Sequence, residues 1–214
     1  MDDSQAFAAI ADERRVLADV LDGLDEGQWA TQSLCSAWDV RGVAAHLLGP
    51  TVTGIPEVIW LVLRARGDFE RSNMALTDRV VRRYGDELPQ MLRANADHRF
   101  TPPGGGPLAP LTDLLVHGQD IRRPLGIGRT FDPDRICAAL DFLMSPAARR
   151  GFAPLRAGVR WVADDVDWAS SPDDRSRPSV HGTAETVLLT LTRRVGAVDG
   201  LSGDGVGVVH TALA

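Results

Sequence analysis

The segment Asp113-Leu-Leu-Val-His-Gly-Gln-Asp120 decides how this chain is expected to fold. Apolar residues recur at helical spacing from Leu111 onward and Pro124 ends the pattern, which predicts one amphipathic helix. Asp113 and His117 are four residues apart, or about 400° of rotation at 3.6 residues per turn. Their side chains therefore project from nearly the same side, one turn apart. This spacing allows one helix to supply two ligands to a single metal ion.

A second segment, Ser36-Ala-Trp-Asp-Val-Arg-Gly-Val-Ala-Ala-His-Leu47, predicts another amphipathic helix. Ser36 is a candidate N-cap. The apolar residues from Val40 to Leu47 repeat at helical spacing and form the expected buried face. Gly49-Pro50 is expected to end the helix, since both residue types favour helix ends.

His46 lies at the edge of that buried face, so two helices packed along their apolar faces can bring it to Asp113 and His117. Two imidazoles and one carboxylate form a three-ligand set with an open position, which is the arrangement of catalytic zinc sites. The pattern also fits a solvated helix face at 113–120, with His46 as a hydrogen-bonded interior histidine. Periodicity alone leaves both interpretations open.

Both segments resemble the two signature segments of the mycothiol-dependent maleylpyruvate isomerase family, which belongs to the DinB-like metal-dependent helical bundles. The first resembles the family's Trp-x-Val-x-x-x-x-x-His pattern, and the second resembles its Glu-x-x-x-His-x-x-Asp pattern. The segments 180–194 and 201–205 resemble the small C-terminal domain of these proteins. The resemblance implies an α+β protein with an N-terminal DinB-like four-helix bundle, followed by a small α+β C-terminal domain.

By this resemblance, His46, Asp113 and His117 occupy the three metal-ligand positions, with zinc as the expected divalent metal. The chain departs from the family pattern at Asp113, where the family usually has glutamate. Because aspartate is one methylene shorter, either the helix sits closer, a water intervenes, or the metal affinity is lower. Asp120 has two interpretations, as a group that orients His117 or as an ion-pair partner of a neighbouring arginine.

The resemblance also implies an activity, with mycothiol as cosubstrate. A low-molecular-weight thiol bound at the open metal position would lose its proton, because coordination lowers a thiol's pKa. The thiolate would then attack a small electrophile, giving an isomerase if the thiol is expelled and a thiol transferase if it stays. The alternative is a non-catalytic protein that binds a small molecule or a partner on the same scaffold, with a degenerate metal site. No residue identifies the electrophile.

The order of predicted elements places a domain boundary near residue 150, giving domains 1–150 and 151–214. Strand-like patterns, rich in β-branched residues and tryptophan, begin after this point. The small second domain is expected to pack on the first, because about 60 residues are marginal alone. The predicted helices are 7–24, 36–48, 56–66, 71–96 with a bend near 85–89, 111–123, 132–149 and 184–191. The predicted strands are 159–162, 166–168, 179–181 and 206–209.

Composition excludes several classes of protein. The 214 residues carry a formal net charge of -6, which argues against a nucleic-acid binder with a basic stripe. The longest apolar run, 58–63, is far shorter than the roughly 20 residues that span a bilayer. The acidic first residues do not resemble a signal peptide. We therefore expect a cytoplasmic protein with no nucleic-acid or membrane partner. The resemblance implies a small-molecule thiol and an electrophilic substrate as its partners, and the oligomeric state is left open.

Cys35 and Cys137 are too few for a disulfide framework. Cys137 lies in an apolar helical pattern and is expected to belong to the core. Cys35 is expected to be structural, although a Cys-His nucleophilic pair is a further interpretation. Trp38 is expected to pack at the start of the second helix, and His181 receives no role.

Overall fold

The computed structural model describes residues 1–155, 157–171 and 176–214. The chain divides into two compact units, which we describe separately. The bundle unit comprises Phe7–Phe100 and His117–Arg129, and the sheet unit comprises Met1–Ala6, Thr101–Val116 and Thr130–Ala214. The helix that carries Asp113 and His117 crosses this division. The predicted domain boundary at 150 stays a prediction.

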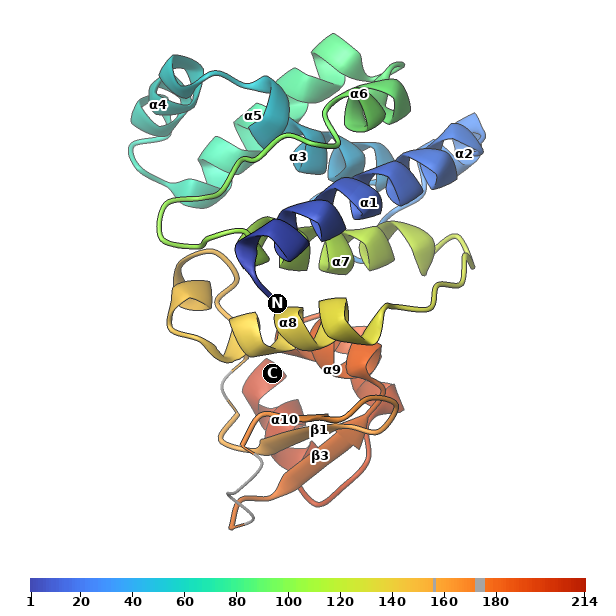
Figure 1. Ribbon diagram of the computed structural model, residues 1–214, viewed down its shortest axis with the longest axis vertical. Helices are drawn as coiled ribbons and strands as arrows, with labels where there is room; N and C mark the ends of the chain where they lie inside the picture. Colours follow the sequence, from blue (N-terminus) through green and yellow to red (C-terminus); the bar gives the residue numbers. More distant parts are fainter. Residues whose placement is uncertain (156, 172–175) are drawn as a thin grey trace. The chain divides into compact units, whose positions relative to one another are not determined.

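The bundle unit is helical. It contains most of α1 (Asp3–Asp22), α2 (Glu26–Trp29), α3 (Val40–Val52), α4 (Ile55–Arg64), α5 (Phe69–Tyr84), α6 (Leu88–Ala94) and the end of α7 (Leu108–Arg122) (Figure 1). Helix α3 packs against α5 and α6. The core is aliphatic and includes the fully buried side chains of Ile10, Leu17, Leu21, Leu48, Leu88, Leu92 and Ile121. Burying one such side chain stabilises the fold by about 1.5–3 kcal/mol.

The sheet unit contains a three-stranded sheet in the order β2-β1-β3. Strand β1 (Arg160–Ala163) pairs antiparallel with β2 (Trp168–Ala169) and parallel with β3 (Ser179–Gly182). The unit's other elements are α8 (Pro133–Met144), η1 (Ala147–Arg150), α9 (Ala184–Leu191), η2 (Val195–Gly200) and α10 (Val206–Leu213). Helix α9 packs against β1, β3 and α8. Trp161 and Trp168 are buried here, and the indole of Trp168 donates a 2.7 Å hydrogen bond to Asp141.

The predicted fold class is confirmed, because the described chain is mostly helical and has a small sheet in its C-terminal region. The bend predicted within 71–96 is the break between α5 and α6. Helix α8 ends earlier than predicted, at Met144, and a 3-10 turn follows it. Strand β2 is also shorter than its predicted range, because residues 164–167 form the turn that precedes it.

The predicted ends of the second helix are wrong at both sides. Helix α3 begins at Val40, and its N-cap is Asp39, whose carboxylate accepts a 2.7 Å hydrogen bond from the Gly42 amide. The helix also continues through Pro50 to Val52. Proline removes one hydrogen-bond donor from a helix, but the Thr53 amide still bonds to the Gly49 carbonyl at 3.1 Å and closes the last turn.

The strand predicted at 206–209 is wrong, because these residues form the first half of α10. The run of valines favours a strand locally. In the structure Val209 is buried and Val208 is exposed, and Val206 and Leu213 are partly buried. The covered residues therefore recur at spacings of three and four, which a helix places on one side. Tertiary packing outweighs the local preference here.

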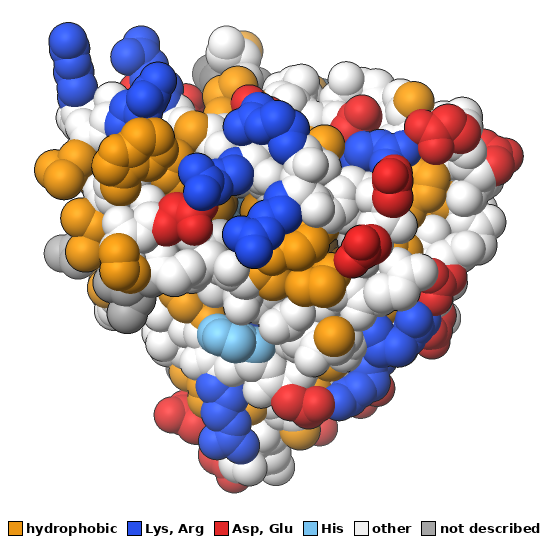
Figure 2. Space-filling model, turned by 90° about the horizontal axis from the view of Figure 1, so that it is seen from above, with side chains coloured by type: hydrophobic (Ala, Val, Ile, Leu, Met, Phe, Trp, Pro, Cys, Tyr) orange, Lys and Arg blue, Asp and Glu red, His pale blue; other side chains and the backbone are white. Residues whose placement is uncertain are grey.

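Helix α4 presents several apolar side chains at the surface, as seen in those of its residues whose burial is described. Ile59, Trp60 and Leu63 are exposed, and Leu61 is buried. Apolar side chains gather on the face shown in Figure 2, with arginines beside them. Among the described residues, no helix has both the length and the hydropathy to cross a membrane.

Candidate metal centre

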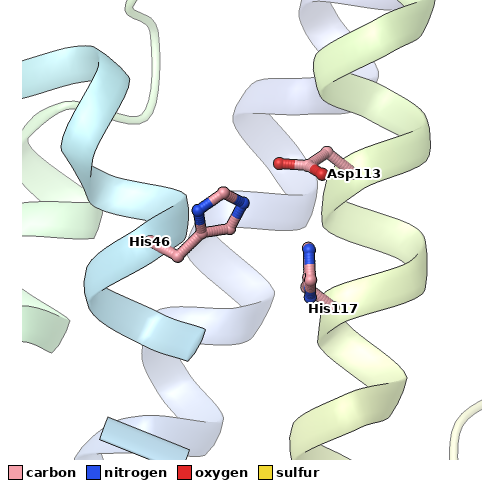
Figure 3. A group of neighbouring side chains, drawn as sticks. All are labelled: His46, Asp113 and His117. Carbon is pink, nitrogen blue, oxygen red and sulfur yellow. The ribbon is translucent and has the colours of Figure 1, made fainter. Parts of the chain in front are cut away.

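Helix α7 supplies two of the three predicted ligands. Asp113 and His117 lie one turn apart on this helix, so their relative position follows from helix geometry. Asp113 is partly buried, and His117 is 9% exposed. Both side chains extend from the same side of the helix (Figure 3). The prediction that Asp113 and His117 project from the same side of one helix is therefore confirmed.

Helix α3 supplies His46, which contacts His117. The two imidazole rings meet edge to face, with their centroids 4.8 Å apart. His46, Asp113 and His117 each offer one ligand atom, and these three atoms all lie within 4.8 Å of one another. The three side chains point toward a common space between the helices (Figure 3). The structure thus brings together the residues that the sequence pattern singled out.

This donor set fits a divalent metal by its geometry. In a tetrahedral site, two atoms bound to one zinc ion at about 2.1 Å lie about 3.4 Å apart. Atoms within 4.8 Å of one another therefore need to approach by at most about 1.4 Å, which side-chain rotation can provide. The shorter side chain of Asp113 reaches the two histidines in this arrangement.

Asp120 orients His117 from the next turn of α7. Its Oδ2 atom lies 2.8 Å from His117 Nδ1, and the Asp120 carboxylate is fully buried. An ionised carboxylate only accepts hydrogen bonds, so in this contact the Nδ1–H group is the donor and Asp120 Oδ2 is the acceptor. The tautomer that carries its proton on Nδ1 has its lone pair on Nε2, as in the carboxylate–histidine pairs that support metal ligands. The structure therefore contains the contact between Asp120 and His117 that the orienting interpretation requires.

Trp38 lies next to the site, whereas the sequence predicted only that it packs at the start of the second helix. Its ring stacks on His46, with the centroids 4.7 Å apart and the planes inclined by 22°. It also lies 6.1 Å from the His117 ring. The signal was present in the sequence as a tryptophan two turns before His46, but periodicity does not reveal ring stacking.

The family model for the mycothiol maleylpyruvate isomerase N-terminal domain matches residues 10–122. This span is more than half of the 214-residue chain and contains His46, Asp113 and His117. The chain belongs to the mycothiol maleylpyruvate isomerase N-terminal domain family. The match confirms the predicted family and the DinB-like class of the helical part. No curated protein and no solved structure matches the chain.

The two cysteines lie outside the cluster of this family member. Neither Cys35 nor Cys137, both within the described residues, forms a disulfide. Burial raises the pKa of the Cys137 thiol, with a further contribution from nearby carboxylates. Cys137 is therefore protonated at neutral pH and a poor nucleophile. Cys137 is half-buried, so it lies at the edge of the core and not within it as predicted.

In the sheet unit of this family member, one histidine, His181, lies in a second cluster of polar side chains. His181 Nδ1 is 3.2 Å from Asp164 Oδ1, and His181 Nε2 is 3.2 Å from the Ser179 hydroxyl. The Ser179 amide donates a 2.6 Å hydrogen bond to Asp204, which lowers the pKa of that carboxyl. These contacts tie β3 to the turns at 164 and 204. We assign this cluster a structural role.

Proposed function

We propose that this chain is a metal- and mycothiol-dependent enzyme, an isomerase or a thiol transferase, that acts on a small electrophile. The observation that carries the proposal is the convergence of His46, Asp113 and His117 within the span matched by the family model. In this proposal the three residues bind one divalent metal ion, with zinc expected. The resemblance to the family supports mycothiol as the thiol.

The three donors would leave one coordination position of a tetrahedral ion for a further ligand. Three protein ligands with one open position are typical of catalytic zinc sites, whereas structural sites have four. A bound divalent ion would lower the pKa of a thiol that binds there, so that the thiolate forms at neutral pH. The carboxylate of Asp113 balances part of the metal's charge, and the two neutral imidazoles add none.

The residues around the ligands supply order and exclude water. The contact with Asp120 occupies His117 Nδ1, so in this proposal Nε2 is the atom that binds the metal. The partly buried position of all three ligands limits access of water, which strengthens electrostatic interactions at the site. For an electrophile with a conjugated double bond, a thiolate in this environment would add to one carbon, forming a C–S bond while the π electron pair moves onto the conjugated part of the molecule. Rotation about the resulting single bond, return of that pair and expulsion of the same thiolate would complete an isomerisation. Retention of the C–S bond, with protonation of the neighbouring carbon by the proton released from the thiol, would complete a transfer.

The proposal places the protein in the cytoplasm, where a low-molecular-weight thiol stays reduced. It also assigns two small-molecule partners to the site, namely the thiol and the electrophile. The name of the family gives maleylpyruvate as its substrate, and the electrophile of this chain is a separate question.

The test is a screen of small electrophiles with the zinc-loaded protein, with and without mycothiol. We expect turnover of at least one electrophile that requires both the thiol and the metal, and that His117→Ala abolishes. His181→Ala is the matched control, because it removes the other histidine–aspartate pair and should leave turnover unchanged. Turnover that persists without the metal, or in the His117→Ala variant, would contradict the proposal.

A further inference from the structure

Trp38 and His46 form the tightest aromatic pair around the candidate metal centre. The two rings are nearly parallel, at 22° and with 4.7 Å between centroids. This geometry is that of a stacked pair, whose energy beyond burial is about 0.5–1.5 kcal/mol. Stacking fixes the plane of the imidazole, because rotation about its last torsion angle would break the parallel contact.

The backbone of Trp38 is itself held in place by several hydrogen bonds. Its carbonyl oxygen accepts from the Ser33 hydroxyl at 2.7 Å, the Ser33 amide at 3.3 Å and the Gln32 side chain at 2.8 Å. Its amide donates to the Cys35 carbonyl at 3.1 Å. A β-bridge between Gln32 and Asp39 closes the segment 32–39. The segment therefore forms a tight loop that presents Trp38 at a defined position.

The loop is also joined to the helix that carries His117. The Leu34 amide donates a 3.2 Å hydrogen bond to the Asp120 carbonyl, and the Asp120 side chain contacts His117. This loop thus contacts both helices that carry a histidine ligand. Its Trp38 stacks on His46 of α3, and its Leu34 bonds to Asp120 of α7. A shift of this loop would change the positions of both imidazoles.

Gly42 provides the space in which the Trp38 side chain lies. A Cβ atom built on Gly42 would lie 2.8 Å from Trp38 Cβ and 3.1 Å from its Cγ. Distances below 3.0 Å do not occur between such atoms without a shift. Glycine at this position therefore lets the tryptophan ring lie against the first turn of α3, one turn before His46.

We propose that Trp38 is a positioning residue for the metal centre: it sets the plane of the His46 imidazole and so the angle at which His46 binds the metal. This inference rests on the proposed function. The two histidines are then oriented by different means, His117 by the carboxylate of Asp120 and His46 by the indole of Trp38. The loop 32–39 and Gly42 serve to hold that indole.

The first test measures metal binding to Trp38→Leu and Trp38→Phe, with Co²⁺ as a spectroscopic probe. Trp38→Leu should weaken binding by about 10–100-fold, as observed for groups that orient metal ligands, and should change the visible absorption of Co²⁺. Trp38→Phe keeps an aromatic face and should restore most of the affinity and the spectrum. Gly42→Ala should act in the same direction as Trp38→Leu, because it displaces the indole.

Trp29→Leu is the matched control. Trp29 is buried in the same unit and contacts Arg41, with the guanidinium 5.2 Å from the ring centroid. Its loss should lower the melting temperature, and leave the Co²⁺ spectrum and affinity unchanged. If Trp38→Leu lowers stability like Trp29→Leu but leaves the spectrum and affinity intact, the inference is overturned.

The second test uses metal-free protein and nuclear magnetic resonance. The ring protons of His46 should carry a ring-current shift that Trp38→Leu removes and Trp29→Leu preserves. Unchanged His46 resonances in Trp38→Leu would overturn the inference. A wild-type protein that shows the shift but binds no Co²⁺ would overturn the proposed metal centre, and with it the positioning role. A changed resonance together with an unchanged Co²⁺ complex would overturn the positioning role alone.

Discussion

Two of the histidine–aspartate pairs among the described residues are alike in composition and differ in surroundings. In α7, His117 Nδ1 lies 2.8 Å from Asp120, whose side chain is 0% exposed. Beside β3, His181 Nδ1 lies 3.2 Å from Asp164, and the two side chains are 36% and 54% exposed. The first pair adjoins another imidazole and another carboxylate, and the second adjoins a serine hydroxyl. Burial and the additional donors, rather than the pair itself, distinguish a candidate centre from a surface contact.

Solvent explains why the two pairs should behave differently. Charged groups interact weakly near water and more strongly in the interior, where the effective dielectric constant is lower. The buried Asp120 carboxylate is costly to place without hydrogen bonds, so its contact with His117 is a constraint on both groups. The exposed Asp164 can exchange His181 for water at little cost. Substitutions at the two pairs can therefore sharpen this comparison or break it.

The largest effect is expected for His117→Ala, which removes a proposed ligand. Its Zn²⁺ affinity, measured by competition with a chelating dye, should fall by more than about 100-fold. Loss of a group that only orients a ligand costs up to about 100-fold, and loss of the ligand itself should cost more. His181→Ala should keep the wild-type affinity. Equal losses in the two variants would break the comparison, because the exposed pair would then matter as much as the buried one.

The second-largest effect on metal binding is expected at Asp113, where two substitutions distinguish three cases. Asp113→Ala should sharply weaken metal binding, because it removes the anionic donor. Asp113→Glu restores the residue usual in the family and should retain the metal if the distance is adjustable. If the helices are already packed around aspartate, overpacking of about 1–3 kcal/mol should cause loss in both variants. Unchanged metal content in both, beside a His117→Ala variant that loses it, would show that Asp113 is not a ligand.

A smaller effect is expected for Asp120→Asn, which keeps the shape of the side chain and removes its charge. The amide can present its NH₂ group to His117 Nδ1 and so favour the other tautomer, with the proton on Nε2. Zn²⁺ affinity should fall by about 10–100-fold. Asp164→Asn is the control at the exposed pair. An affinity in Asp120→Asn equal to that of wild type would remove the orienting role of Asp120.

The smallest effect is expected at the exposed pair itself. Asp164→Asn and His181→Ala should each change the free energy of unfolding by less than about 1 kcal/mol, as measured for exposed ion pairs. Thermal or denaturant unfolding of the two variants checks this. A much larger loss would mean that the contacts around β3 stabilise the sheet unit far more than their exposure implies.

The parts of the site that could be predicted from sequence are those governed by one helix. Asp113 and His117 share a face of α7 because their spacing sets it, and no tertiary information is needed. The approach of His46 depends on how α3 packs, and the expectation came from its place at the edge of the buried face together with the resemblance to a family. Asp120 was left with two interpretations, because helix periodicity does not say which neighbour a carboxylate contacts.

The errors in the predicted fold have the same origin. Ser36 was expected to cap α3, but the loop 32–39 holds Trp38 by bonds between its own groups, and Asp39 caps the helix instead. The stacking of Trp38 on His46 depends on that loop and on the absence of a side chain at Gly42. The valines at 206–209 suggested a strand, but their burial on one side selects a helix. Each error concerns tertiary contacts that local patterns do not contain.

The metal content of the protein, purified without an affinity tag or chelator, tests the central claim most directly. Elemental analysis should find about one divalent ion per chain in the wild type and in His181→Ala, and much less in His117→Ala. Zinc added to metal-depleted wild-type protein should restore the same ratio. A wild-type protein that remains free of metal after exposure to zinc, or a His117→Ala variant that retains it, would contradict the proposed centre at His46, Asp113 and His117.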